Sequence, residues 1–136
     1  SGRPPAGREL FKKHCAACHK LFGEGGKIAP DLTMTSRKDL EALLANIVDP
    51  GAVIRRDFLA SVVVTTNGRM VTGLVVNRKG DHLEVADSKG KIARIPKADV
   101  EIEKVSDTSI MPERLLEQLT PQQLRDLVSY LQGTAP

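Results

Sequence analysis

The sequence predicts an α+β chain, in which a mainly helical domain carries a small inserted antiparallel β-sheet or barrel. Two observations lead to this expectation. Apolar residues recur at helical spacing towards both ends of the chain, whereas residues 57–105 alternate short β-rich runs with tight turns. A length of 136 residues fits one domain. We therefore expect a single domain over residues 1–136, with residues 57–105 inserted into it.

The first predicted helix spans residues 5–18. Gly7, Phe11 and Cys15 lie four positions apart and therefore share one face of that helix. A glycine on a packed face lets a second helix approach closely, because it has no Cβ. We expect that second helix to be the last one in the chain, which carries Tyr130.

Three further helices are expected, after a loop over residues 20–35. Ser36 is a suitable N-cap for a helix over residues 37–48, and a short helix is expected to start at Pro112. The last helix has the clearest signals, which are a Thr120 cap, Pro121 at the first position, Gln123 to complete a capping box, and Gly133 after its end.

The middle of the chain predicts about five antiparallel strands. Asn67-Gly68 between two runs of β-branched residues is a strong hairpin signal. An isolated meander would expose an edge and an apolar face, so we expect the strands to pack on the helices or to close on themselves. The expected strands are 62–66, 71–76, 82–85, 92–95 and 100–105.

The stretch Cys15-Ala16-Ala17-Cys18-His19 contains both cysteines of the chain. Cys-x-x-Cys-His is the attachment pattern of a c-type haem. Two thiols on neighbouring turns of a helix can add to the vinyl groups on one edge of a porphyrin, and the following imidazole can reach the iron. The stretch therefore predicts one haem c, bound covalently through Cys15 and Cys18 and ligated by His19.

A Cys-x-x-Cys pair has two other common uses, dithiol redox chemistry and half of a zinc site. A dithiol motif would need a βαβ context, whereas the residues before Cys15 look helical. A zinc site would need further cysteine or histidine ligands. The remaining histidines, His14 and His82, are isolated, and we expect His14 to be a surface or packing residue and His82 to be exposed on a strand.

The second axial ligand of the iron is expected to be Met111, because a thioether there favours ferrous iron and raises the reduction potential. Met111 stands in an irregular segment fixed by Pro112, from which a loop can present a side chain. Met34 and Met70 are expected to be packing residues. The alternative is that Met111 is an apolar plug and the iron is five-coordinate or binds water.

Positive charge is concentrated near the motif, although the net charge is only +3. The basic residues concerned are Lys12, Lys13, Lys20, Lys27, Arg37 and Lys38. They form either an ordinary solvated face or a patch that steers an acidic redox partner. Nucleic acid binding is not expected without an aromatic platform, and no apolar run is long enough to span a membrane. The start, Ser-Gly-Arg-Pro-Pro, looks processed or excised, so a longer parent protein is expected.

These residues together resemble class I cytochrome c. More closely, the chain is similar to the haem-binding domain of the planctomycete and verrucomicrobial type, through the stretches 30–33, 39–50, 68–75, 95–96 and 111–112. The resemblance implies a cytochrome c fold, an extracytoplasmic (periplasmic) location and electron acceptance from a fused or docked dehydrogenase. It also implies that the carbonyl of Pro30 accepts the second ring N–H of His19, as ligating histidines require.

The function expected from the sequence is that of a monohaem electron carrier, monomeric and without enzymatic activity of its own. No carboxylate pair or nucleophile–base set stands out. The main alternative is a haem-based gas-sensing or ligand-binding module with a weak or absent sixth ligand. A peroxidase ranks lower, because no distal histidine or arginine is evident.

Overall fold

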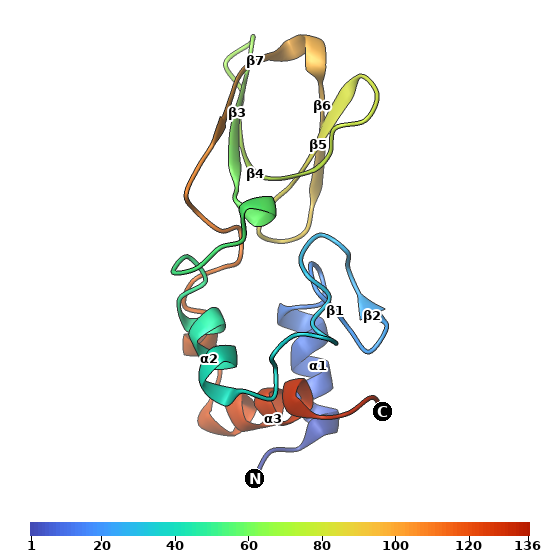
Figure 1. Ribbon diagram of the computed structural model, residues 1–136, viewed down its shortest axis with the longest axis vertical. Helices are drawn as coiled ribbons and strands as arrows, with labels where there is room; N and C mark the ends of the chain where they lie inside the picture. The colour runs from blue at the N-terminus through green and yellow to red at the C-terminus, as the bar shows by residue number, and fades with distance from the viewer. The chain divides into compact units, whose positions relative to one another are not determined.

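The computed structural model describes all of residues 1–136, and it divides into two compact units (Figure 1). Unit 1 comprises Ser1–Pro50 together with Glu113–Pro136, and unit 2 comprises Gly51–Pro112. The predicted insertion, residues 57–105, lies inside unit 2. The chain contains both helices and strands, which agrees with the α+β class expected from the sequence. No helix is both long enough and apolar enough to cross a bilayer.

Unit 1 contains three α-helices, one short 3-10 helix and a two-stranded sheet. In chain order these are α1 (Pro4–His14), β1 (Lys20–Leu21), β2 (Glu24–Gly25), α2 (Leu40–Val48), η3 (Leu115–Gln118) and α3 (Pro121–Gln132). The signals of α3 are confirmed, since Thr120 and Gln123 form a reciprocal capping box and Pro121 occupies the first turn.

Helices α1 and α3 pack against each other at Gly7, as predicted. A Cβ on Gly7 would lie 1.9 Å from the carbonyl oxygen of Asp126 and 2.8 Å from the Cβ of Tyr130. The buried rings of Phe11 and Tyr130 meet one turn further along, with centroids 5.7 Å apart. The contact therefore needs a glycine on one helix and aromatic rings beside it.

Helix α1 ends at His14, four residues earlier than predicted. The N–H groups of Cys15 and Ala16 both donate to the carbonyl of Phe11, which breaks the helical pattern. The carbonyls of Ala16 and Cys18 accept hydrogen bonds from residues of the following loop. The motif therefore lies on turns after the helix, and its backbone acceptors bond the following loop.

The predicted loop over residues 20–35 begins with a hairpin that was not foreseen. Strands β1 and β2 pair antiparallel across Phe22 and Gly23, which both have positive φ, 51° and 84°. Two positive φ values at the central positions are typical of a type I′ turn. Phe22 is an unusual residue for this conformation, and its ring contacts Tyr130 edge-on at 5.7 Å.

Two predicted helix starts were wrong. Helix α2 begins after Asp39 instead of Ser36, and the Asp39 carboxylate accepts from the N–H of Ala42 at 3.1 Å. The short helix expected from Pro112 is a 3-10 helix that begins only after Arg114, whose φ of 59° is left-handed. In both places the residue before the helix, Asp39 or Arg114, has a non-helical backbone conformation that sets the start.

Unit 2 is built on five antiparallel strands, at nearly the positions predicted. They are β3 (Ser61–Thr65), β4 (Met70–Asn77), β5 (His82–Ala86), β6 (Ile92–Pro96) and β7 (Val100–Val105), with 3-10 turns at Arg56–Phe58 and Lys97–Asp99. The strand order is β6-β5-β4-β3-β7, so β6 and β7 are the end strands. The expected Asn67-Gly68 hairpin joins β3 to β4, with Gly68 at φ 84°.

The sheet has its own hydrophobic core. Val63, Leu83, Val85 and Ile95 are almost completely buried and form one cluster, supplied by β3, β5 and β6. Alternation along β3 explains this, because Ser61, Val63 and Thr65 face inwards while the residues between them are half-buried. Unit 2 therefore buries apolar surface of its own.

Candidate haem-attachment site

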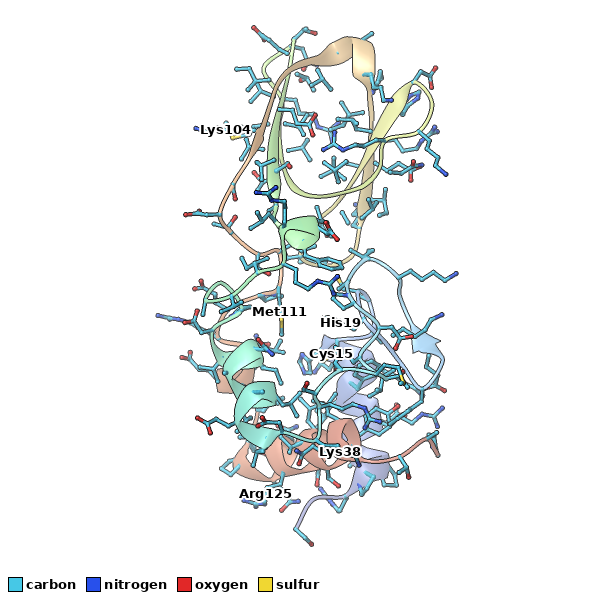
Figure 2. All side chains as sticks on the ribbon, viewed as in Figure 1. Cys15, His19, Lys38, Lys104, Met111 and Arg125 are labelled. Carbon is cyan, nitrogen blue, oxygen red and sulfur yellow. The ribbon has the colours of Figure 1, made fainter.

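The motif residues occupy one turn at the end of α1 (Figure 2 labels Cys15 and His19). The N–H groups of Cys18 and His19 both donate to the carbonyl of Cys15, at 3.1 and 2.9 Å. These bonds hold both cysteines and the histidine within one turn of backbone. That is the arrangement required for two thioethers and one iron ligand on a single porphyrin.

The following loop packs directly on the motif backbone. The N–H of Gly26 donates to the carbonyl of Ala16 at 2.8 Å, and the N–H of Ala29 donates to that of Cys18 at 2.9 Å. A Cβ on Gly25 would lie 2.0 Å from the carbonyl oxygen of His19, and one on Gly26 would lie 2.4 Å from that of Ala17. The glycines are therefore needed for the loop to approach this closely.

His19 makes the hydrogen bond that the resemblance implied. Its Nδ1 lies 2.8 Å from the carbonyl oxygen of Pro30, an acceptor that requires Nδ1 to carry the proton. In that tautomer Nε2 keeps its lone pair and can bind a metal. Burial lowers the pKa of His19, and the Pro30 carbonyl partly opposes this effect. Burial therefore favours the neutral ring, and the hydrogen bond fixes its orientation, as in a metal-ligating histidine.

The thiol of Cys15 does not resemble a dithiol redox centre. Burial raises its pKa to about 11, and the nearby Cys18 contributes in the same direction. Reactive dithiol motifs instead lower the pKa of the attacking thiol. No group of three His, Cys, Asp or Glu side chains is placed to hold a metal ion. The two cysteines followed by an oriented histidine instead match the attachment pattern of a thioether-linked haem.

The methionines differ in their exposure. Met34 is 92% exposed and Met70 is 68% exposed, so the expectation that they pack was wrong. Met111 is half-buried, and its N–H donates to the hydroxyl of Ser109 at 3.1 Å. Met111 belongs to unit 2 whereas His19 belongs to unit 1, so its assignment as the second iron ligand stays a prediction.

The two remaining histidines have local surroundings only. Burial lowers the pKa of His14, and Lys13 adds to the effect. His82 is half-buried instead of exposed, and its Nδ1 lies 2.8 Å from the carboxylate of Asp81. Neither histidine is therefore assigned a role as an iron ligand.

Arg37 was wrongly grouped with the exposed basic residues. Its guanidinium donates to backbone carbonyls of Thr33, Leu131 and Gly133, and it lies over the ring of Phe22. Lys20 is also half-buried. The exposed cations of this group are Lys12, Lys13, Lys27 and Lys38.

Asp126 is an important residue that the sequence reasoning missed. It is 1% exposed and lies at the contact between α1 and α3. Its carboxylate accepts from the backbone N–H of Arg3 at 2.8 Å, from the Arg3 guanidinium at 2.7 Å and from Gln122 at 2.8 Å. The only signal in the sequence was its place directly before Leu127, a residue of the apolar stripe of the last helix.

A turn with two cysteines and an oriented histidine, closed by a glycine loop, is the arrangement expected of a protein with covalently attached haem. The family model described as Cytochrome c matches residues 5–70, slightly less than half of the chain. This match supports a c-type cytochrome. Cytochrome c proteins bind haem c covalently through two cysteines, and the cofactor here is haem c, with Cys15 and Cys18 at that spacing. Met111 lies outside the matched residues.

The other comparisons add little. No curated protein matches this chain. Among solved structures, a crystal structure of the pleiotropic translational regulator Hfq is 18% identical, with a TM-score of 0.33, and covers 54% of this chain and 100% of its own. A likeness of that size carries no argument about fold or function.

Proposed function

We propose that this chain is a monohaem electron carrier whose iron is ligated by His19 and Met111. The observation that carries the proposal is the hydrogen bond from His19 Nδ1 to the Pro30 carbonyl, which leaves the lone pair of Nε2 available to bind iron. The match to Cytochrome c supports the same function, since that family generally consists of electron carriers. We further propose the planctomycete and verrucomicrobial type, with unit 2 inserted into a mainly helical cytochrome fold.

Each residue of the proposed haem site has a defined task. Bound haem iron supplies one-electron redox chemistry. Cys15 and Cys18 hold the porphyrin, and Pro30 keeps the His19 ring in one orientation. Met111 supplies a thioether, which favours the ferrous state and raises the potential. His19 and Met111 would hold the iron in both oxidation states, which would keep the reorganisation on electron transfer small.

The proposed partner is an acidic redox protein, with a fused or docked dehydrogenase as the electron donor. The exposed lysines Lys12, Lys13 and Lys27, close to the motif in sequence, support this, because their positive charge would steer a negative surface. We propose a periplasmic location, since cytochrome c domains are typically extracytoplasmic in bacteria. A monomer is proposed as the functional form.

The test is to express the chain with a haem-attachment system and to record its mass and optical spectrum. We expect the mass of one covalent haem, and a ferric spectrum with a methionine–iron charge-transfer band. The double substitution Cys15→Ser and Cys18→Ser should lose the covalent haem. Haem-free wild-type protein under these conditions would contradict the proposal.

The same preparation distinguishes the gas-sensing alternative. An electron carrier with two protein ligands should bind carbon monoxide slowly or not at all in its ferrous form. A five-coordinate spectrum with rapid binding of carbon monoxide by the untreated protein would favour a ligand-binding module instead.

A further inference from the structure

The Pro30 carbonyl stands in a segment that is attached to the hairpin β1–β2 and to the motif. On one side, the N–H of Ala29 donates to the carbonyl of Cys18 at 2.9 Å. On the other side, the N–H of Leu32 donates to the carbonyl of Lys20 at 2.8 Å. These two backbone bonds limit where the Pro30 carbonyl can lie relative to the His19 ring.

Thr33 adds a side-chain connection between the same segments. Its hydroxyl accepts from the N–H of Phe22 at 3.0 Å and donates to the carboxylate of Asp31 at 2.7 Å. That carboxylate also accepts from the N–H of Thr33 at 2.9 Å. Asp31 follows Pro30 directly, so these bonds fix the backbone just beyond the carbonyl that His19 uses.

Arg37 connects this segment to the C-terminal end of α3. Its Nε donates to the carbonyl of Thr33 at 3.1 Å, and its Nη1 donates to Leu131 at 2.9 Å and to Gly133. The last carbonyls of a helix lack intrahelical partners, and a planar guanidinium can satisfy several acceptors at once. The Cζ atom of Arg37 lies 4.8 Å from the centre of the Phe22 ring.

We propose that Thr33 and Arg37 are positioning residues, which hold the Pro30 carbonyl against His19 Nδ1 and thereby set the electron donation of His19 to the iron. We call Asp31, Thr33 and Arg37 the proximal clamp. The inference rests on the proposed function, because it assigns the clamp an effect on a haem ligated by His19.

The physical consequence has a definite direction. A firm hydrogen bond from Nδ1 makes the imidazole a stronger donor, and stronger donation stabilises ferric iron. A weakened clamp should let the Pro30 carbonyl move away, so that the donor becomes weaker and the reduction potential rises. The Nδ1 proton should also exchange with solvent faster.

The experiment compares Thr33→Val and Arg37→Gln with the wild-type protein. Thr33→Val keeps the side-chain volume and leaves Arg37 in place, so it serves even where Arg37→Gln fails to fold. Lys38→Gln is the matched control for charge, because Lys38 also donates to the end of α3, at Gln132, but has no bond to Thr33. Thr66→Val is the control for the threonine, at an exposed position of unit 2.

Two quantities are measured, the exchange rate of the His19 Nδ1 proton by NMR and the reduction potential. We expect both clamp variants to raise the exchange rate about fivefold, the factor that corresponds to about one net hydrogen bond. The potential should shift upwards, and both controls should keep wild-type values. Wild-type exchange and potential in folded clamp variants would overturn the proposal and show that the Ala29 and Leu32 backbone bonds suffice.

The exchange measurement separates this proposal from the proposed function. It requires only the His19 ring and can be made on the protein as purified, with or without haem. If the wild-type protein carries no haem, the proposed function fails, while unchanged exchange in Thr33→Val would still refute the clamp on its own.

Discussion

A Cβ on Gly7 would lie 1.9 Å from the carbonyl oxygen of Asp126, so α1 and α3 approach closely enough to exclude any side chain at position 7. Nothing flexible can move aside, because the nearest atom belongs to the backbone of α3. The two ends of the chain therefore meet through a contact that only glycine permits.

Gly7→Ala should destabilise the protein by about 1–3 kcal/mol, the usual cost of forcing an extra group into a packed contact. Denaturant unfolding followed by circular dichroism measures this. Gly51→Ala is the matched control, because a Cβ there meets no atom within 4 Å. Equal stability of the two variants would contradict the packing described.

Met111→Ala should remove the methionine–iron charge-transfer band and lower the reduction potential, because the thioether that favours ferrous iron is lost. Optical spectroscopy and redox titration measure these changes. Met34→Ala and Met70→Ala are the controls, since both side chains are mostly exposed. A band that survives in Met111→Ala would show that another group ligates the iron.

Asp126→Asn should reduce stability at neutral pH and flatten its dependence on acid. The Arg3 guanidinium, followed by Gln122 and the Arg3 backbone, holds the pKa of Asp126 well below its ordinary value of 3.8, although burial opposes this. A depressed folded-state pKa contributes stability above that ordinary value, and the contribution is lost as the pH falls below it.

Denaturant unfolding across a pH series from neutral to acid checks this prediction. The difference between wild type and Asp126→Asn should be largest at neutral pH and shrink below about pH 4, where the unfolded-state carboxyl takes up its proton. Asp49→Asn, at an exposed position after α2, should leave the profile unchanged. A difference that stays constant with pH would argue against the ionised pair.

Leu83→Ala should destabilise unit 2 by about 2–5 kcal/mol, because it opens a cavity in the cluster of Val63, Val85 and Ile95. Thermal unfolding by circular dichroism is the measurement. Ile102→Ala is the control, as Ile102 is 52% exposed on the end strand β7. Comparable melting of the two variants would mean that the cluster is not the core of this unit.

The sequence by itself determined the features that depend on neighbouring residues. The Thr120–Gln123 capping box, the Asn67-Gly68 hairpin and the spacing of Cys15, Cys18 and His19 all follow from short-range chemistry. The five strands of unit 2 were also predicted to within a few residues, because tight turns delimit them.

Only the tertiary structure decided where α1 ends, what Arg37 does and why Asp126 is buried. Helix α1 stops early because the N–H of Ala16 donates to the carbonyl of Phe11 instead of that of Lys12, and loop residues then bond the carbonyls of Ala16 and Cys18. The sequence predicts a surface cation at Arg37, whereas its guanidinium bonds the carbonyl of Leu131 at the end of α3, 94 residues away in sequence. Such outcomes depend on which distant groups satisfy a backbone or a charge, and no local pattern encodes that pairing.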